Sequence, residues 1–125
     1  MNKKLKLAIA GIAVCCFVLS CKHKTAFETL PVVHYNATIA PIISGNCTFS
    51  GCHGDSTYKK FELINYDGVM KYCDVKANSP ETSKLYTVIN TFNEEKLMPK
   101  KPYSQLTEKQ MQLIYVWIGQ GAKNN

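Results

Sequence analysis

The sequence contains no arginine, because all fifteen of its residues in the Lys and Arg class are lysine. Arginine is favoured in recognition of phosphates and base edges, and the lysines form no basic stripe, so a nucleic-acid partner is not expected. Glycine (7) and proline (5) are scarce among the 125 residues, which excludes the collagen-like and disordered classes. A single long apolar run excludes a polytopic membrane protein and leaves one small domain.

That apolar run extends from Leu7 to Leu19 and follows three lysines. Its thirteen residues make about 20 Å of helix, which is too short to cross a hydrocarbon core of about 30 Å. A basic start, a short apolar stretch and the small residue Ser20 are typical of a secretory signal peptide. We therefore predict that residues 1–20 are removed, leaving twelve lysines against nine acidic residues and a net charge of +3.

The expected cleavage site, Val18-Leu19-Ser20-Cys21, resembles the lipobox of bacterial lipoproteins. The resemblance implies cleavage before Cys21, a diacylglycerol joined to its sulfur and an acyl group on its new amine, which together anchor a protein firmly. We expect residues 21–33 to form a lipidated, flexible tether and residues 34–125 to form a domain that faces the periplasm. Lys22 replaces the aspartate associated with inner-membrane retention, so the outer membrane is preferred. An ordinary secreted protein with an incidental cysteine is the alternative.

Three cysteines remain for the domain itself: Cys47, Cys52 and Cys73. A disulfide framework in an exported protein needs an even number of thiols, so at most one disulfide bond can form here. We infer that these cysteines serve another purpose, with Cys73 as a buried small apolar residue.

No segment alternates like a β-strand, so the predicted fold class is all-α. Apolar residues recur at helical spacing in four segments, each preceded by a residue that can cap a helix. The first predicted helix spans 36–45 and is capped by Asn36, and the second spans 66–73 and is capped by Asn65 or Asp67. The third begins at Pro80 after Ser79 and contains Leu85, Val88 and Ile89. The fourth spans 107–120, starts with a capping box of Thr107 and Gln110 and ends at Gly121.

Two cysteines and a histidine form the motif most suggestive of chemistry, Cys47-x4-Cys52-His53. Covalent attachment of haem requires two thiols that add to the vinyl groups and an adjacent imidazole that reaches the iron. The usual spacing is C-x-x-C-H, so the longer linker must bulge, which Ser50 and Gly51 permit. A Cys47–Cys52 disulfide is one alternative. A zinc site that adds Cys73 or His34 to the motif is another.

Residues 34–125 resemble the single-haem cytochrome c domain of bacterial lipoproteins that use the C-x4-C-H variant. The resemblance implies a small bundle of about four helices around one haem c held by Cys47 and Cys52, with His53 as proximal and Met98 as distal iron ligand. It is carried by the segments Ile39-Ala40-Pro41-Ile42-Ile43, Asn46-Cys47, Ser50-Gly51-Cys52-His53-Gly54, Tyr66-Asp67-Gly68-Val69-Met70, Ser79-Pro80-Glu81-Thr82-Ser83-Lys84-Leu85-Tyr86, Leu97-Met98-Pro99 and Val116-Trp117-Ile118-Gly119-Gln120-Gly121-Ala122.

The position of Met98 favours the same role independently of any family. It lies 45 residues after His53 in the long irregular segment 91–105, and long loops in compact domains are usually functional or disordered. Met70 and Met111 lie in predicted helices, where methionine fills the core.

The sequence therefore predicts a membrane-anchored electron carrier rather than an enzyme, because iron bound by His53 and Met98 leaves no position open for a substrate. Periplasmic or membrane redox proteins are the expected partners, and the protein is expected to be a monomer. Lys96, Lys100 and Lys101 flank Met98 and could steer an acidic partner, although a solvated face is the simpler interpretation. A five-coordinate haem enzyme or gas sensor and a metal-free lipoprotein adaptor are the alternatives.

Overall fold

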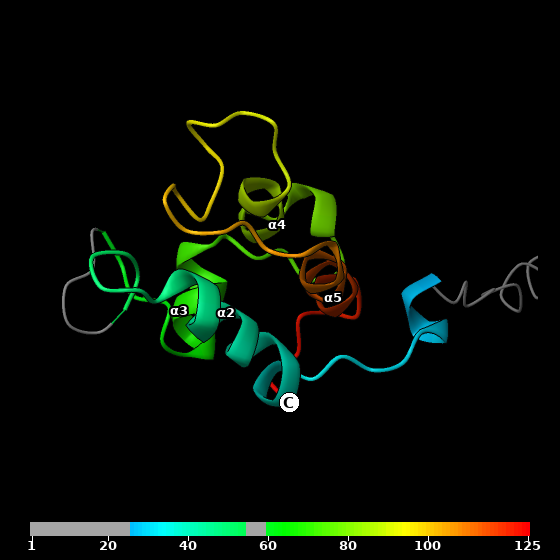
Figure 1. Cartoon of the computed structure of the whole chain (residues 1–125). Coiled ribbons are helices and arrows are strands. Elements are labelled where there is room, and N and C mark those ends of the chain that lie inside the picture. Colours follow the sequence, from blue (N-terminus) through cyan, green and yellow to red (C-terminus); the bar gives the residue numbers. More distant parts are fainter. Residues whose placement is uncertain (1–25, 55–59) are drawn as a thin grey trace, which may run out of the picture.

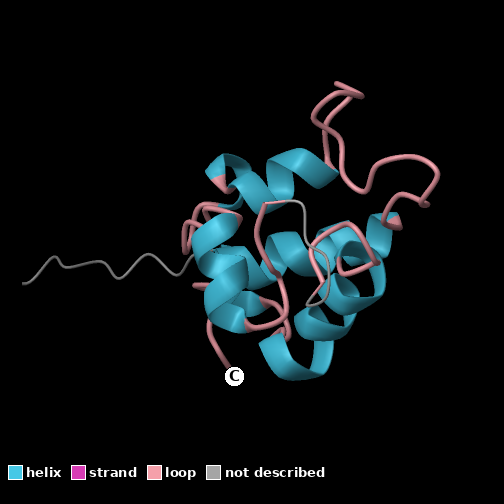
Figure 2. Ribbon diagram, turned by 90° about the vertical axis from the view of Figure 1, so that its left-hand side faces the viewer, coloured by secondary structure: helices cyan, strands magenta, loops and turns pink. Residues whose placement is uncertain are grey.

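The computed structural model describes residues 26–54 and 60–125, and in these ranges it contains helices and no strand (Figures 1 and 2). The predicted all-α class is confirmed for this part of the chain. The signal peptide and Cys21 lie outside the described residues. In chain order the elements are η1 (Ala26–Thr29), η2 (Tyr35–Ile39), α2 (Ala40–Cys47), α3 (Tyr66–Tyr72), η3 (Pro80–Thr82), α4 (Lys84–Ile89) and α5 (Glu108–Gly119).

The first predicted helix starts earlier and ends later than expected. Its opening turn, η2, is a π-helical turn in which the Ile39 N–H donates to the His34 carbonyl at 3.3 Å, so His34 rather than Asn36 is the N-cap. Because Pro41 has no N–H to donate, it sits without penalty at the start of α2, and the helix then continues past Gly45. The prediction of an end near Gly45 was wrong, and Cys47 is the last helical residue.

The third predicted helix is interrupted by a buried serine. η3 and α4 are separated by Ser83, which has extended backbone angles and no exposed surface. The Ser83 hydroxyl accepts the Lys76 N–H at 2.8 Å and lies 3.0 Å from the Ser79 carbonyl. These bonds tie the preceding loop to the start of α4, and serine favours such local bonds over a continuous helix. The prediction of one capped helix from Ser79 was wrong, since the Ser79 side chain makes no capping bond and Ser83 is the N-cap of α4.

The second and fourth helices agree with their capping signals. The Asn65 side chain accepts the Gly68 N–H at the start of α3, and Thr107 and Gln110 form the expected capping box on α5. At the other end of α5, the Gly121 backbone has a positive φ of 97°. Its N–H donates to Ile118 and the next N–H donates to Trp117, which is the pair of bonds that ends helices at glycine.

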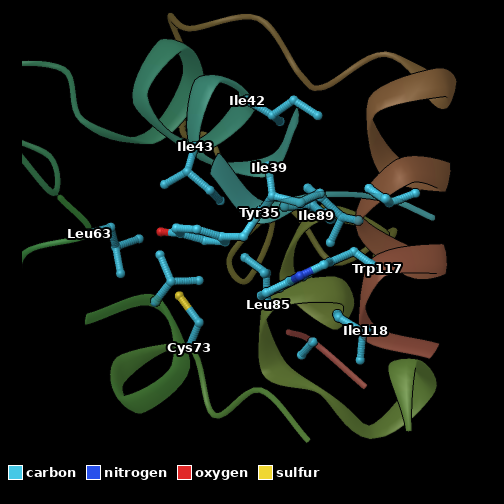
Figure 3. Close-up of a cluster of buried hydrophobic side chains, with 14 of the residues drawn as sticks. Tyr35, Ile39, Ile42, Ile43, Leu63, Cys73, Leu85, Ile89, Trp117 and Ile118 are labelled. Atoms are coloured by element: carbon cyan, nitrogen blue, oxygen red, sulfur yellow. The ribbon is translucent and has the colours of Figure 1, made fainter. Parts of the chain in front are cut away.

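The core lies where α5 meets η2 and α4, and Trp117 is its largest fully buried side chain (Figure 3). Tyr35 packs against it with ring centroids 5.6 Å apart. Burying a large apolar side chain contributes about 1.5–3 kcal/mol, so this contact stabilises the packing of the two ends of the domain. The other buried apolar residues are Val33, Ile39, Ile42, Ile43, Leu63, Val69, Cys73, Leu85, Ile89, Leu106, Ile114, Ile118 and Ala122.

The segment between residues 26 and 33, which the sequence assigned to the tether, lies against the C-terminal end of α5. Gln120 accepts a hydrogen bond from the Val33 N–H, and the Phe27 ring packs 5.5 Å from that of Tyr115. The described part of the predicted tether is therefore attached to the domain. No helix among the described residues is long and apolar enough to cross a membrane.

Candidate functional site

The Cys47-x4-Cys52-His53 motif forms a closed turn at the C-terminal end of α2. The His53 N–H donates to the Cys47 carbonyl at 3.1 Å, and the Cys52 N–H donates to the Phe49 carbonyl at 2.8 Å. Gly51 has a positive φ of 76°, a conformation that favours glycine, so the longer linker bulges where the sequence predicted. The turn brings Cys47, Cys52 and His53 together on one short piece of backbone.

The thiols of this turn are free. Cys47 and Cys52 are half-buried, and Cys73 is buried at the end of α3, as the sequence predicted. Burial raises the pKa of Cys47 to about 12, and the nearby Cys73 and Cys52 thiols add to the shift. Burial likewise raises the pKa of Cys73 to about 11, although Lys84 acts in the opposite direction. Cys47 is therefore a protonated thiol at neutral pH.

The two other interpretations of the motif gain no support from this geometry. Cys47 and Cys52 are not joined by a disulfide bond. Within residues 26–54 and 60–125, no three side chains of His, Cys, Asp or Glu are grouped so that they could hold a metal ion, which is what a zinc site would require. His34 is exposed at the start of η2.

The ring of His53 is held in a defined orientation by Phe61. Its Nδ1 lies 3.1 Å from the Phe61 carbonyl oxygen, and the two rings stack with centroids 4.4 Å apart and planes 11° apart. A carbonyl oxygen can only accept, so Nδ1 carries the proton and Nε2 of the neutral ring keeps its lone pair. Ligating histidines use this arrangement, in which the second nitrogen donates to a carbonyl and fixes the tautomer.

The stack continues from Phe61 to the surface. Phe61 also stacks on Tyr72, with ring centroids 5.2 Å apart and planes 12° apart, and Tyr72 is 40% exposed. The Lys71 ammonium lies 5.1 Å from the Tyr72 centroid. A hollow of about 400 Å³ opens beside these residues, lined by Phe61, Lys71 and Tyr72 among others. The sequence did not predict this stack of three rings, because Phe61 and Tyr72 belong to no motif and only their aromatic character indicates it.

Met98 lies in a loop that is fixed to the rest of the domain. Its N–H donates to the Val88 carbonyl of α4 at 2.8 Å, its side chain is half-buried, and the following Pro99 is buried. Gln105 donates to the Pro99 carbonyl at 2.6 Å and so closes the loop upon itself. The two methionines that lie in helices, Met70 and Met111, pack against the core, as the sequence predicted.

Two stacked rings connect the Met98 loop with the cysteine turn. Phe49, inside the motif, stacks on Tyr103 with centroids 4.3 Å apart and planes only 4° apart. The two segments, about fifty residues apart in sequence, therefore lie side by side. Met98 does not share the hydrogen-bonded turn that joins Cys47, Cys52 and His53, and the connection shown by the structure is made by these rings.

Two of the lysines around Met98 bond to oxygen atoms of Glu94 and Glu95, and only Lys101 meets a carboxylate. The Lys100 ammonium donates to the Glu94 carbonyl at 3.0 Å and also to that of Glu95, and Lys101 forms an exposed ion pair with Glu94 at 3.4 Å. Exposed pairs of this kind contribute little to stability. They do reduce the local positive potential, which favours the interpretation of these lysines as a solvated face.

The residues of the turn fit a covalently attached haem by the chemistry of their donor atoms. Two uncommitted thiols flank a bulged turn, and the adjacent imidazole presents a lone pair on Nε2 while Nδ1 is engaged. A zinc site would need further ligands that this turn lacks. No protein-family model, curated protein or solved structure matches this chain.

Proposed function

We propose that this protein is a membrane-anchored c-type cytochrome that transfers single electrons between redox proteins of the periplasm or membrane. The observation that carries the proposal is the hydrogen bond from His53 Nδ1 to the Phe61 carbonyl, beside two free thiols on the same turn. This bond is the one that orients an axial imidazole and fixes its tautomer, so it supports His53 as a ligand.

Each residue of the site has a distinct part in this proposal. Cys47 and Cys52 would hold haem c through thioether bonds, which prevents its loss. His53 would bind the iron through Nε2 and Met98 through its sulfur. When bound, the haem supplies a centre that gains and loses one electron reversibly. With both residues bound, the iron would have no position for a substrate, which favours a carrier over an enzyme.

Burial limits the reactivity of two of the three thiols with oxidants and disulfides. It raises the pKa of Cys47 to about 12 and that of Cys73 to about 11, so both thiols are protonated at neutral pH. In an oxidising compartment this protonation would reduce the formation of wrong disulfides.

The remaining parts of the proposal concern location and partners. Lipidation at Cys21 would tether the domain to a membrane, with the outer membrane preferred and the domain on the periplasmic side. Exchange of one electron at a time with periplasmic or membrane redox proteins needs only brief contact, so a monomer suffices.

Covalent haem is the part of the proposal to test first. The full chain, produced in bacteria with a haem-attachment system, should give a coloured protein whose band retains haem peroxidase activity after denaturing electrophoresis. A Cys47→Ser, Cys52→Ser double variant should lose that activity, while Cys73→Ala should keep it. A colourless wild-type protein would contradict the proposal and favour the metal-free adaptor. A protein whose colour is released by denaturation would contradict the covalent attachment.

A further inference from the structure

Residues 26–33, called the strap from here on, are held on the C-terminal end of α5 by the side chain of Gln120. Its Oε1 accepts the Val33 N–H at 2.9 Å. Its Nε2 lies 3.0 Å from the Pro31 carbonyl, 3.4 Å from that of Leu30 and 3.3 Å from that of Phe27. A primary amide has both an accepting oxygen and two N–H donors, so one side chain fixes the strap at both of its ends.

Gly119 of α5 leaves room for the strap to pack against the helix. A Cβ atom at Gly119 would lie 2.4 Å from the ring of Phe27, so only glycine allows this ring to lie on the helix backbone. The same ring contacts Tyr115 one turn earlier, with centroids 5.5 Å apart. The strap is thus bound by a matched surface rather than by incidental contact.

The outer side of the strap is apolar from Leu30 to Val32, after the exposed Glu28 and Thr29. Leu30 is 43% exposed and Val32 is 63% exposed, with the exposed Pro31 between them. The other exposed large apolar side chains in the described ranges, namely Ile64, Tyr72, Phe92 and Tyr103, are scattered singly along the chain. Adjacent exposed apolar residues on a fixed segment are a feature of surfaces that meet a partner or a membrane.

The short length of chain between the strap and the expected lipid anchor favours the membrane as the partner of this apolar surface. Cys21 precedes Ala26 by five residues, which span at most about 18 Å when fully extended. With lipid on Cys21, the first residue of the strap, Ala26, stays within that distance of the bilayer surface. We propose that the outer face of the strap, Leu30 to Val32, rests on the headgroup region of the membrane, an inference that relies on the lipidation contained in the proposed function.

This arrangement would also fix which part of the domain faces away from the membrane. In Figure 1 the strap lies on the right of the domain, whereas the turn after α2 that carries Cys52 and His53 lies on the left, with α5 and α2 between them. A docked strap therefore presents the cysteine turn to the periplasm, where a redox partner can reach it. A free tether would leave the domain to tumble.

Site-directed spin labelling of the full lipoprotein in vesicles of phosphatidylethanolamine and phosphatidylglycerol tests the inference. A nitroxide on Val32→Cys should lose access to a water-soluble nickel chelate several-fold compared with the same label in the unanchored Cys21→Ser protein. A matched label on Phe92→Cys, at a fully exposed loop position, should be equally accessible in both. Equal accessibility of the Val32 label in both forms would overturn the inference while leaving the lipid anchor intact.

The role of Gln120 is tested separately in the same vesicles. Gln120→Ala removes the bonds to the strap, so the Val32 label should become mobile and regain access to the chelate, whereas the exposed Gln112→Ala on the same helix should change neither. An unaffected Val32 label in Gln120→Ala would overturn the fixed strap. A wild-type protein that remains soluble after lysis would overturn both the anchor and this inference.

Discussion

Phe61 supports His53 in two ways, since its carbonyl oxygen lies 3.1 Å from Nδ1 and its ring stacks 4.4 Å from the imidazole. One residue thus fixes both the tautomer and the plane of the candidate iron ligand. The two interactions differ in their dependence on sequence, because any residue supplies the carbonyl whereas only an aromatic side chain supplies the stack. A substitution at Phe61 can therefore remove the second interaction and leave the first.

We expect Phe61→Leu to lower the free energy of unfolding by about 1–3 kcal/mol, because the stacked contacts with both His53 and Tyr72 are lost and each aromatic pair contributes about 0.5–1.5 kcal/mol. Urea unfolding followed by circular dichroism measures this change. The control is Phe92→Leu, the same substitution at a fully exposed ring, which should change stability by less than about 0.5 kcal/mol. Similar effects of the two substitutions would argue against a special role for the stack.

The parts of the fold that the sequence predicted correctly are those determined by local chemistry. The caps at Asn65 and Thr107 and the glycine at the end of α5 involve bonds between residues only a few positions apart, so the pattern alone identifies them. The split between η3 and α4 was missed because the Ser83 hydroxyl bonds to the Lys76 backbone seven residues earlier, in the loop before η3. Helix propensity does not indicate such a bond.

The candidate site divides in the same way. The turn that joins Cys47, Cys52 and His53 follows from spacing and from Gly51. The stacking of Phe49 on Tyr103 and of Phe61 on His53 joins residues whose proximity depends on how the whole chain packs. The packing of the strap on Gln120 could not be predicted from the sequence for the same reason, since the segment has no periodicity and its partner lies about ninety residues away.

The two histidines of the domain should differ sharply in their effect on the haem spectrum. His53→Ala should remove the axial ligand and change the Soret and α bands, because the imidazole oriented by the Phe61 carbonyl is lost. His34→Ala should leave the spectrum unchanged, since His34 is exposed and supports η2 only through its backbone carbonyl. Visible spectroscopy of purified protein distinguishes the two, and equal sensitivity of both positions would argue against His53 as ligand.

Alkylation of Cys47 in the haem-free chain should show an unusual pH dependence. The thiolate is the reactive species, and below a pKa of about 12 its population rises about tenfold per pH unit, so the rate should still be climbing at pH 10. Peptide mass spectrometry after timed reaction with iodoacetamide follows this residue separately from the others. In urea the burial is lost, and the rate should level off near the ordinary thiol pKa of about 8.5. A rate that already levels off near pH 9 in the folded chain would show that Cys47 is not protected by burial.

Replacement of Met98 decides between an electron carrier and a haem with an open coordination position. The backbone N–H of Met98 donates to a carbonyl of α4, and the Phe49–Tyr103 stack joins the Met98 loop to the cysteine turn. A thioether favours ferrous over ferric iron, so Met98→Ala should lower the reduction potential, abolish the weak near-infrared sulfur-to-iron band of the ferric form and allow the ferrous form to bind carbon monoxide. Met111→Leu, which keeps an apolar side chain packed against the core, should change none of these properties. Ready binding of carbon monoxide by the wild-type protein, or an unchanged spectrum in Met98→Ala, would remove Met98 from the iron and favour a five-coordinate enzyme or gas sensor.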